Sequence, residues 1–229
     1  MLRGMGNGCP TDSINLIMTD KTLNGLYAIT DTSLLANNFA EAIEQTLLGG
    51  ARIIQYRDKS TDTDRRLKEA QIIRKLCDKY DATFIINDDL KLAIDSQADG
   101  VHLGKDDHDI KQARQRLGNE KIIGTSCYNQ LQLALEAEQA GADYVAFGAF
   151  FNSSIKPEAL TAPISIIAEA KAQIQLPVCC IGGITAENAG QLIDAGTDMI
   201  AVISDVFNPK NEKQSIKQAS LTLSQLFSA

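Results

Sequence analysis

The chain has 229 residues, of which 44% are hydrophobic and 22% charged, a composition typical of a globular protein with a sizeable core. Its net charge of −7 argues against a surface for nucleic acid or for an anionic membrane, so an anionic ligand would need local cations, backbone N–H groups or a metal ion. No run of about 18 apolar residues predicts a membrane span, and Met1–Thr22 lacks the basic start and apolar core of a signal peptide.

Residues 1–22, rich in Gly, Asn, Thr and Asp, are predicted to form a flexible lead-in to a catalytic domain over 23–229. In that domain, short runs rich in β-formers alternate with helical patterns. The predicted strands are 25–30, 52–59, 83–86, 100–103, 121–125, 143–147, 177–181 and 198–203.

The intervening segments show helical spacing of apolar residues. A stripe over 39–47 repeats at i, i+3 and i+4. A second helix is predicted to begin at a Thr61 cap with Asp64 three residues on, and to run to about 80. Another is predicted from about Thr185.

Strict alternation of strands and helices with right-handed crossovers indicates a parallel sheet. Eight such units in roughly 205 residues favour a single α/β domain, a (β/α)8 TIM barrel. The alternative is an open doubly wound sheet, which is disfavoured because no Gly-x-Gly-x-x-Gly follows the first strand.

Polar side chains cluster where the predicted strands end, which is where a barrel of this kind carries its active site. Gln55, Arg57 and Lys59 alternate along the second strand and are expected to share one face, where two cations suit an anionic ligand. The plainer interpretation is a solvated strand end with a local Arg57–Asp58 or Lys59–Asp62 ion pair.

A phosphate site is predicted after the seventh and eighth strands, the usual place in this fold. Gly182 and Gly183 precede a predicted helix, and Ile203-Ser204 closes the eighth strand, so backbone N–H groups could approach a phosphate. The alternative is that the two glycines are there only because a turn with a left-handed backbone needs glycine.

Two carboxylates, Asp88 and Asp107, follow neighbouring strands and would suit Mg²⁺ shared with a phosphate. The alternative is that both cap helices. A count along the fourth strand turns His102 away from these groups, as a core or supporting residue, and His108 is expected at the surface.

These residues resemble the thiamine phosphate synthase family over most of the chain from Leu26 to Ser204. The motifs that carry the resemblance are Gln-Tyr-Arg-Asp-Lys at 55–59, Ile-Asn-Asp-Asp at 86–89, Gly-Val-His-Leu-Gly-Lys-Asp-Asp at 100–107, Ile-Gly-Thr-Ser at 123–126, the segment 148–156, and Ile-Gly-Gly-Ile at 181–184.

The resemblance implies that an aminopyrimidine-methyl diphosphate is joined to a thiazole phosphate, giving thiamine phosphate and diphosphate with Mg²⁺ as cofactor. By the same resemblance, the metal ligands are Asp88 and Asp107. It implies that the pyrimidine diphosphate is held by Gln55, Arg57, Lys59, Asn87, Ser126 and Lys156, and the thiazole phosphate by Gly183, Ile203 and Ser204.

An amino-substituted pyrimidine can delocalise a benzylic-type positive charge, so the implied displacement is dissociative. Catalysis would then consist of stabilising the departing diphosphate, with Arg57, Lys59 and Lys156 in catalytic roles, and of aligning the thiazole nitrogen. No protein nucleophile is required, and the sequence offers no Ser–His or Cys–His arrangement.

The loop before Lys156 departs from the family. Ile155 stands where a threonine is usual, and Gly148-Ala149 and Asn152 stand where prolines are frequent. Ser153 and Ser154 are predicted to supply hydroxyl groups to the substrate instead.

Three other functions stay open. A thiazole tautomerase or regulator would share the barrel but would not need the 55–59 cations, a Schiff-base aldolase would use Lys156, and a phosphate-ligand-binding barrel would have no turnover.

The five cysteines (Cys9, Cys77, Cys127, Cys179, Cys180) show no Cys-x-x-Cys spacing and are expected to be free cytoplasmic thiols. The sequence leaves the oligomeric state open, a homo-oligomer included.

Overall fold

Eight parallel strands close into a barrel in the order β1 to β8, each hydrogen-bonded to its neighbours in the chain and β8 to β1. The computed structural model describes residues 23–228 except 36–37, 105–108, 153–160 and 209–213. The strands are β1 (Gly25–Ile29), β2 (Ile53–Tyr56), β3 (Thr83–Asn87), β4 (Gly100–Leu103), β5 (Ile122–Tyr128), β6 (Tyr144–Gly148), β7 (Val178–Ile181) and β8 (Met199–Val202).

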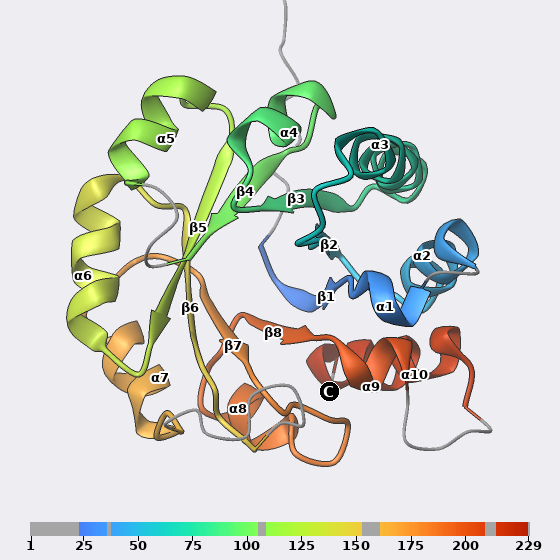
Figure 1. Cartoon of the computed structure of the whole chain (residues 1–229). Coiled ribbons are helices and arrows are strands. Elements are labelled where there is room, and N and C mark those ends of the chain that lie inside the picture. Colours follow the sequence, from blue (N-terminus) through green and yellow to red (C-terminus); the bar gives the residue numbers. More distant parts are fainter. Residues whose placement is uncertain (1–22, 36–37, 105–108, 153–160, 209–213, 229) are drawn as a thin grey trace, which may run out of the picture.

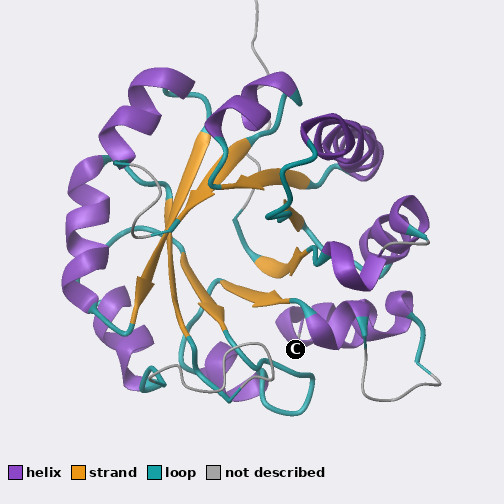
Figure 2. Cartoon of the chain, viewed as in Figure 1, coloured by secondary structure: helices purple, strands orange, loops and turns teal. Residues whose placement is uncertain are grey.

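Helices surround the barrel as an outer ring (Figure 1), and every strand is joined to the next through one or more of them (Figure 2). They are α1 (Thr32–Leu35), α2 (Phe39–Leu48), α3 (Thr63–Tyr80), α4 (Leu90–Asp95), α5 (Ile110–Leu117), α6 (Leu131–Ala140), α7 (Ser165–Lys171), α8 (Gly190–Asp194), α9 (Ser204–Phe207) and α10 (Ile216–Gln225), followed by the 3₁₀ turn η1 (Leu226–Ser228).

The strands alternate between two cores. Outward residues such as Ile54, Val101 and Phe147 pack against the helix ring, and inward residues such as Tyr27, Ile85 and Tyr144 fill the barrel. Successive residues of a strand point to opposite faces, and here one face packs against the helices while the other fills the barrel. Because both faces are buried, the strands are almost wholly apolar. The polar residues inside the barrel therefore stand out against an apolar lining.

All eight predicted strands and the single TIM barrel are confirmed. Several boundaries differ. β2 ends at Tyr56, so Arg57 and Lys59 lie in the following loop, and β5 continues to Tyr128. The cap of α3 is Asp62, whose carboxylate accepts a 3.0 Å hydrogen bond from Arg65 N, so the predicted Thr61 cap was wrong.

The helix predicted from Thr185 is also wrong, because α8 begins at Gly190. The side chain of Asn188 explains the difference. It accepts a 2.8 Å hydrogen bond from Thr185 N and donates a 2.9 Å one to Gly183 O, which favours a local turn over a helix.

The four cysteines within the described ranges, Cys77, Cys127, Cys179 and Cys180, are buried free thiols as expected. Cys9 and the predicted lead-in over 1–22 lie outside those ranges. No helix in the described part of the chain is both long and apolar enough to cross a membrane.

Candidate active site

The carboxyl end of β2 carries the first predicted site residues. Gln55 points into the barrel and is only 2% exposed, with its Nε2 donating a 2.8 Å hydrogen bond to the Tyr27 hydroxyl. Arg57 follows the strand, with its backbone N–H held by Thr30 Oγ1 at 2.9 Å. Arg57 is half-buried and Lys59 exposed, and neither side chain has an ion-pair partner among the described residues. Within the described part of the chain, both cations are therefore available to an anion.

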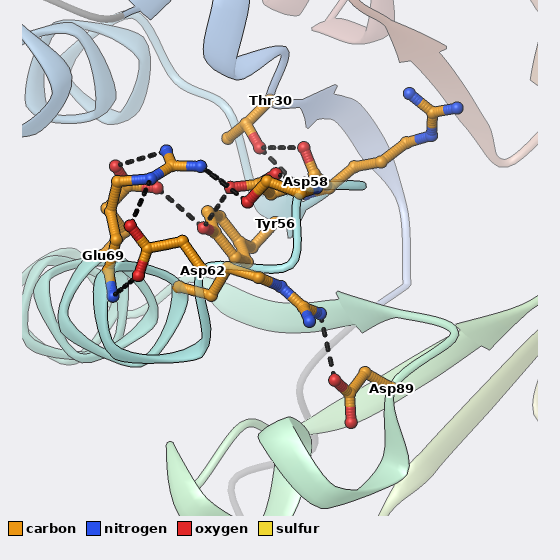
Figure 3. A network of polar contacts seen from close by, with 10 residues as sticks. Thr30, Tyr56, Asp58, Asp62, Glu69 and Asp89 are labelled. Atoms are coloured by element: carbon orange, nitrogen blue, oxygen red, sulfur yellow. Dashed lines mark hydrogen bonds and ion pairs between the residues drawn. The ribbon is translucent and has the colours of Figure 1, made fainter.

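Asp58, between these cations, does not form the local pair with Arg57 considered from the sequence. It points outward, where its side chain is 2% exposed and its Oδ2 lies 2.5 Å from Arg65 of α3. Its Oδ1 accepts from Ser60 N at 2.7 Å, and the Tyr56 hydroxyl reaches its Oδ2 at 3.2 Å. Figure 3 shows Tyr56, Asp58 and Glu69 turned toward one another beside α3. The acid thus fixes the loop from which its two neighbours project.

Burial alone would raise the pKa of Asp58, but hydrogen bonds from Ser60 and the charge of Arg65 outweigh it and hold that pKa below its usual value. The Lys59–Asp62 pair is likewise absent from the described contacts, since Asp62 caps α3 and lies 3.8 Å from Arg65. Asp58 is therefore a charged structural anchor at neutral pH.

Asp88 and Asp89, which follow β3, make different contacts. Asp89 caps α4 by accepting from Leu92 N at 2.9 Å, and it also pairs with Arg66 at 3.0 Å (Figure 3). Asp88 has a left-handed backbone with φ 62°. It accepts from Asn87 Nδ2 and, at 3.2 Å, from the backbone N–H of Gly104 beyond β4. The capping alternative is therefore wrong for Asp88.

Asp88 supplies one carboxylate of the kind that binds Mg²⁺. Mg²⁺ in proteins is held by one or two carboxylates together with substrate phosphates and water, and Asp88 offers such a carboxylate at the carboxyl end of the barrel. The described residues contain no cluster of three or more metal-binding side chains. Asp107, the other predicted ligand, and His108 lie outside those residues.

A chain of hydrogen bonds crosses the barrel interior. The hydroxyls of Tyr27 and Tyr144 are 2.8 Å apart, Tyr144 Oη lies 2.9 Å from His102 Nδ1, and His102 Nε2 lies 3.0 Å from Ser126 Oγ. The prediction that His102 faces away from the site was wrong. Val101 and Leu103 face the helices, so the residue between them faces inward, a parity that the sequence already contained.

Neither tyrosine nor the contact between Ser126 and His102 was predicted from the sequence. Burial lowers the pKa of His102 to about 4, so the imidazole is neutral at neutral pH. Burial also raises the pKa of Tyr27 and of Tyr144, which keeps both hydroxyls protonated. The hydrogen-bonded side chains inside the barrel are therefore an uncharged series of donors and acceptors.

The predicted phosphate-binding residues follow β7 and β8, at the same carboxyl end of the barrel. Gly182 and Gly183 have φ of 104° and 63°, and a side chain at Gly183 would press on the carbonyl oxygens of Phe151 and Asn152. Across from them, Ile203 precedes α9, and Asp205 accepts from Ala186 N at 3.1 Å, joining the two loops. Neither Gly183 N nor Ser204 N has an acceptor in the described part of the chain.

The remaining predicted residues, Ser153, Ser154 and Lys156, lie outside the described residues, as does Ile155. Asn87 ends β3, and Ser126 lies in the last part of β5, with β4 between the two strands; both side chains are half-buried. The structure thus gathers the predicted groups from β2, β3 and β5 at one mouth of the barrel.

A family model described as thiamine monophosphate synthase matches residues 26–206. The chain belongs to the thiamine monophosphate synthase family. Its relatives include the thiamine-phosphate synthase of Nitrosococcus oceani, 50% identical over 191 residues that cover 83% of this chain and 88% of the relative. That of Thioalkalivibrio sulfidiphilus is 47% identical over 205 residues, covering 89% and 97%.

A solved structure agrees with this family. Thiamine phosphate pyrophosphorylase from Pyrococcus furiosus superposes with a TM-score of 0.81 at 33% identity, covering 91% of this chain and 97% of that one. The family match over residues 26–206 includes β2 to β8 and all of β1 but Gly25, and with them the ends of β2, β3 and β5 described above.

Proposed function

We propose that this protein is a thiamine-phosphate synthase that joins an aminopyrimidine-methyl diphosphate to a thiazole phosphate and releases diphosphate. The single observation that carries the proposal, beyond family membership, is the mouth of the barrel at β2. There a buried amide, Gln55, lies next to Arg57 and Lys59, two cations without ion-pair partners among the described residues. An amide suits a nitrogen heterocycle, and cations suit its diphosphate.

The two phosphorylated ligands would bind at the same mouth of the barrel, over the ends of different strands. The diphosphate would lie over Arg57 and Lys59, assisted by Asn87, Lys156 and the hydroxyls of Ser153 and Ser154. The thiazole phosphate would lie against the N–H groups of Gly183 and Ser204 and the backbone at Ile203. The left-handed glycine backbone lets a phosphate approach closely there.

Mg²⁺ is part of the proposal, with Asp88 and Asp107 as its ligands. When bound, such an ion neutralises charge that develops on a departing diphosphate. In the dissociative displacement, Arg57, Lys59 and Lys156 would stabilise that charge by charge-assisted hydrogen bonds, while Gln55 and Ser126 hold the pyrimidine ring in line with the thiazole nitrogen.

Nucleophilic catalysis by Ser126 is disfavoured although His102 lies within hydrogen-bond distance. In hydrolase triads the second imidazole nitrogen donates to a carboxylate, which leaves the first as a base toward serine. Here the partner of Nδ1 is the hydroxyl of Tyr144, and no carboxylate contacts the ring among the described residues. This supports a reaction without a covalent enzyme intermediate.

The test is diphosphate release when both substrates and Mg²⁺ are supplied, with Arg57→Ala beside the wild type. Losing one charge-assisted hydrogen bond should raise KM for the pyrimidine diphosphate by about 10- to 150-fold, while the affinity for the thiazole phosphate alone stays unchanged. Arg116→Ala, an exposed residue of α5, is the matched control and should behave as wild type.

The outcomes separate the other functions. No diphosphate release would disprove the synthase and favour a tautomerase or a binding protein, and borohydride trapping of a carbonyl compound on Lys156 would favour an aldolase. If Arg57→Ala weakens the binding of both ligands equally, Arg57 does not belong to the diphosphate site alone and its assignment is wrong. A cytoplasmic location belongs to the same proposal, supported by the free thiols of the described cysteines.

A further inference from the structure

The hydrogen-bonded chain inside the barrel has two ends, and both belong to proposed substrate contacts. Gln55 lies at one end and Ser126 at the other, and between them lie only Tyr27, Tyr144 and His102. His102 is partly exposed, whereas both tyrosines are at most 1% exposed and do not reach the mouth of the barrel. Any effect they have on a ligand must pass through the two ends.

The hydrogen bonds of this series are all donated in one direction, which follows from the donor of the first bond, Gln55 Nε2. Gln55 Nε2 can only donate to the Tyr27 oxygen, so the Tyr27 hydrogen is free to go to Tyr144. The Tyr144 hydrogen then goes to His102 Nδ1, which must be the unprotonated nitrogen of a neutral ring. Nε2 therefore carries the hydrogen and donates it to Ser126 Oγ.

The direction determines what each end offers to a ligand. At one end, Gln55 Oε1 has no hydrogen-bond partner among the described residues and can accept, and Nε2 has a second hydrogen to donate. At the other, Ser126 accepts from His102 and keeps its own hydrogen to donate. Turning the Gln55 amide over would place Oε1 at Tyr27 and would require every hydrogen along the chain to reverse.

A 4-aminopyrimidine matches this direction. Its exocyclic amino group donates and the adjacent ring nitrogen accepts, which complements Oε1 and the free Nε2 hydrogen of Gln55. A 4-oxo pyrimidine carries the opposite pattern, a carbonyl acceptor next to a ring N–H donor. It would pair with Gln55 only in the reversed amide orientation.

We propose that Tyr27, Tyr144 and His102 are positioning residues that lock the orientation of the Gln55 amide and thereby make the site specific for 4-amino over 4-oxo pyrimidines. The inference rests on the proposed function, because it takes Gln55 to be a contact of the pyrimidine ring. Neither tyrosine reaches the mouth of the barrel, so both would act on the substrate only through the residues at the two ends.

The packing holds the chain in place. The Tyr144 ring stacks on His102 at 5.6 Å between ring centroids and meets Tyr27 edge-on at 6.1 Å. On its other side, the Tyr144 ring fills the space that a side chain at Gly124 would need. With both rings fixed, each hydroxyl oxygen stays within reach of the same partners, and the hydrogen bonds along the series determine which way the Gln55 amide faces.

The experiment measures dissociation constants of 4-amino-2-methyl-5-pyrimidinylmethyl diphosphate and of its 4-oxo counterpart by calorimetry, for wild type and Tyr144→Phe. The wild type should prefer the amino compound by about 100-fold or more. In Tyr144→Phe, the Tyr27 hydroxyl loses its acceptor and the Gln55 carbonyl becomes its best partner, so the preference should fall by about tenfold. Tyr27→Phe should lower the preference similarly.

Tyr56→Phe is the matched control. It removes a hydroxyl from an equally buried tyrosine on the outer face of β2, bonded at 2.7 Å to Glu69, so the preference should stay at the wild-type value. A merely structural role of Tyr144 would weaken both compounds alike and leave their ratio unchanged.

An unchanged ratio in Tyr144→Phe, with wild-type diphosphate release intact, overturns the inference and leaves the proposed function standing. A wild type that binds neither compound and releases no diphosphate overturns both. Thermal melting checks that each variant is folded, and if Tyr144→Phe does not fold, Tyr27→Phe decides in the same way.

Discussion

Asp58 should be needed to place its neighbours Arg57 and Lys59, and the substitution Asp58→Asn tests this. Asparagine keeps the shape and the oxygen that accepts from Ser60 N. It replaces the oxygen that faces Arg65 and the Tyr56 hydroxyl by an amide group. The change therefore removes the charge of the anchor and leaves the rest of the loop chemically intact.

The expected cost follows from the contacts of Asp58. A hydrogen bond between charged groups contributes about 1.5–3 kcal/mol. The Arg65 side chain is 39% exposed and retains Glu69 at 3.1 Å, so the loss should lie near the lower end, about 1.5–2 kcal/mol. For a chain of 229 residues this lowers Tm by about 3–8 °C. Loss of loop order should also raise KM for the pyrimidine diphosphate by about threefold or more.

The assay combines thermal melting at neutral pH with steady-state kinetics at varied pyrimidine diphosphate. Asp62→Asn is the control, since it removes a carboxylate 3.8 Å from Arg65 and alters the cap of α3 but keeps the Asp58–Arg65 pair. It should lower Tm slightly and leave KM unchanged. A Tm of Asp58→Asn within about 1 °C of wild type, or an unchanged KM beside a lowered Tm, would refute the reasoning.

Three further outcomes are expected. Asp88→Ala, like chelation of Mg²⁺, should lower turnover more than about 100-fold in the diphosphate-release assay, because charge stabilisation is lost; activity that survives chelation would contradict the metal assignment. Gly124→Ala should cost about 1–3 kcal/mol in denaturant unfolding, since its methyl group overlaps the Tyr144 ring. Because the folded pKa of His102 is about 4, below the unfolded value near 6.5, stability should fall by about 1.4 kcal/mol per pH unit between those values as pH drops. His102→Gln should lack that component in melts run from pH 7 to pH 5.

The barrel could be predicted because its signals are local. Each strand is a short apolar run bounded by turn residues, and each inward or outward position follows from alternation by two. The same local reasoning failed where a side chain competes with the backbone. Asn188 turns the segment after Gly183 into a loop, and Asp58 pairs seven residues ahead with Arg65 rather than with its neighbour.

The interior chain could be predicted only in part. Parity along β4 would have turned His102 inward, beside Ser126 on β5. The contact between Tyr27 and Tyr144 joins residues 117 positions apart and exists only because the barrel closes. No spacing in the sequence encodes such a pair, and it is this contact that gives the site residues their common orientation.

The same chain bears on how the barrel folds. If the barrel is divided into β1–β4 and β5–β8, Tyr27 and His102 fall in one half and Tyr144 and Ser126 in the other. Only the Gln55–Tyr27 bond survives within a half; the other three bonds cross the division. A half-barrel with its interior formed would therefore bury hydroxyls and an imidazole without partners, each at a cost of about 1–3 kcal/mol. We expect the two halves to acquire their interiors together, and neither fragment to be stable alone.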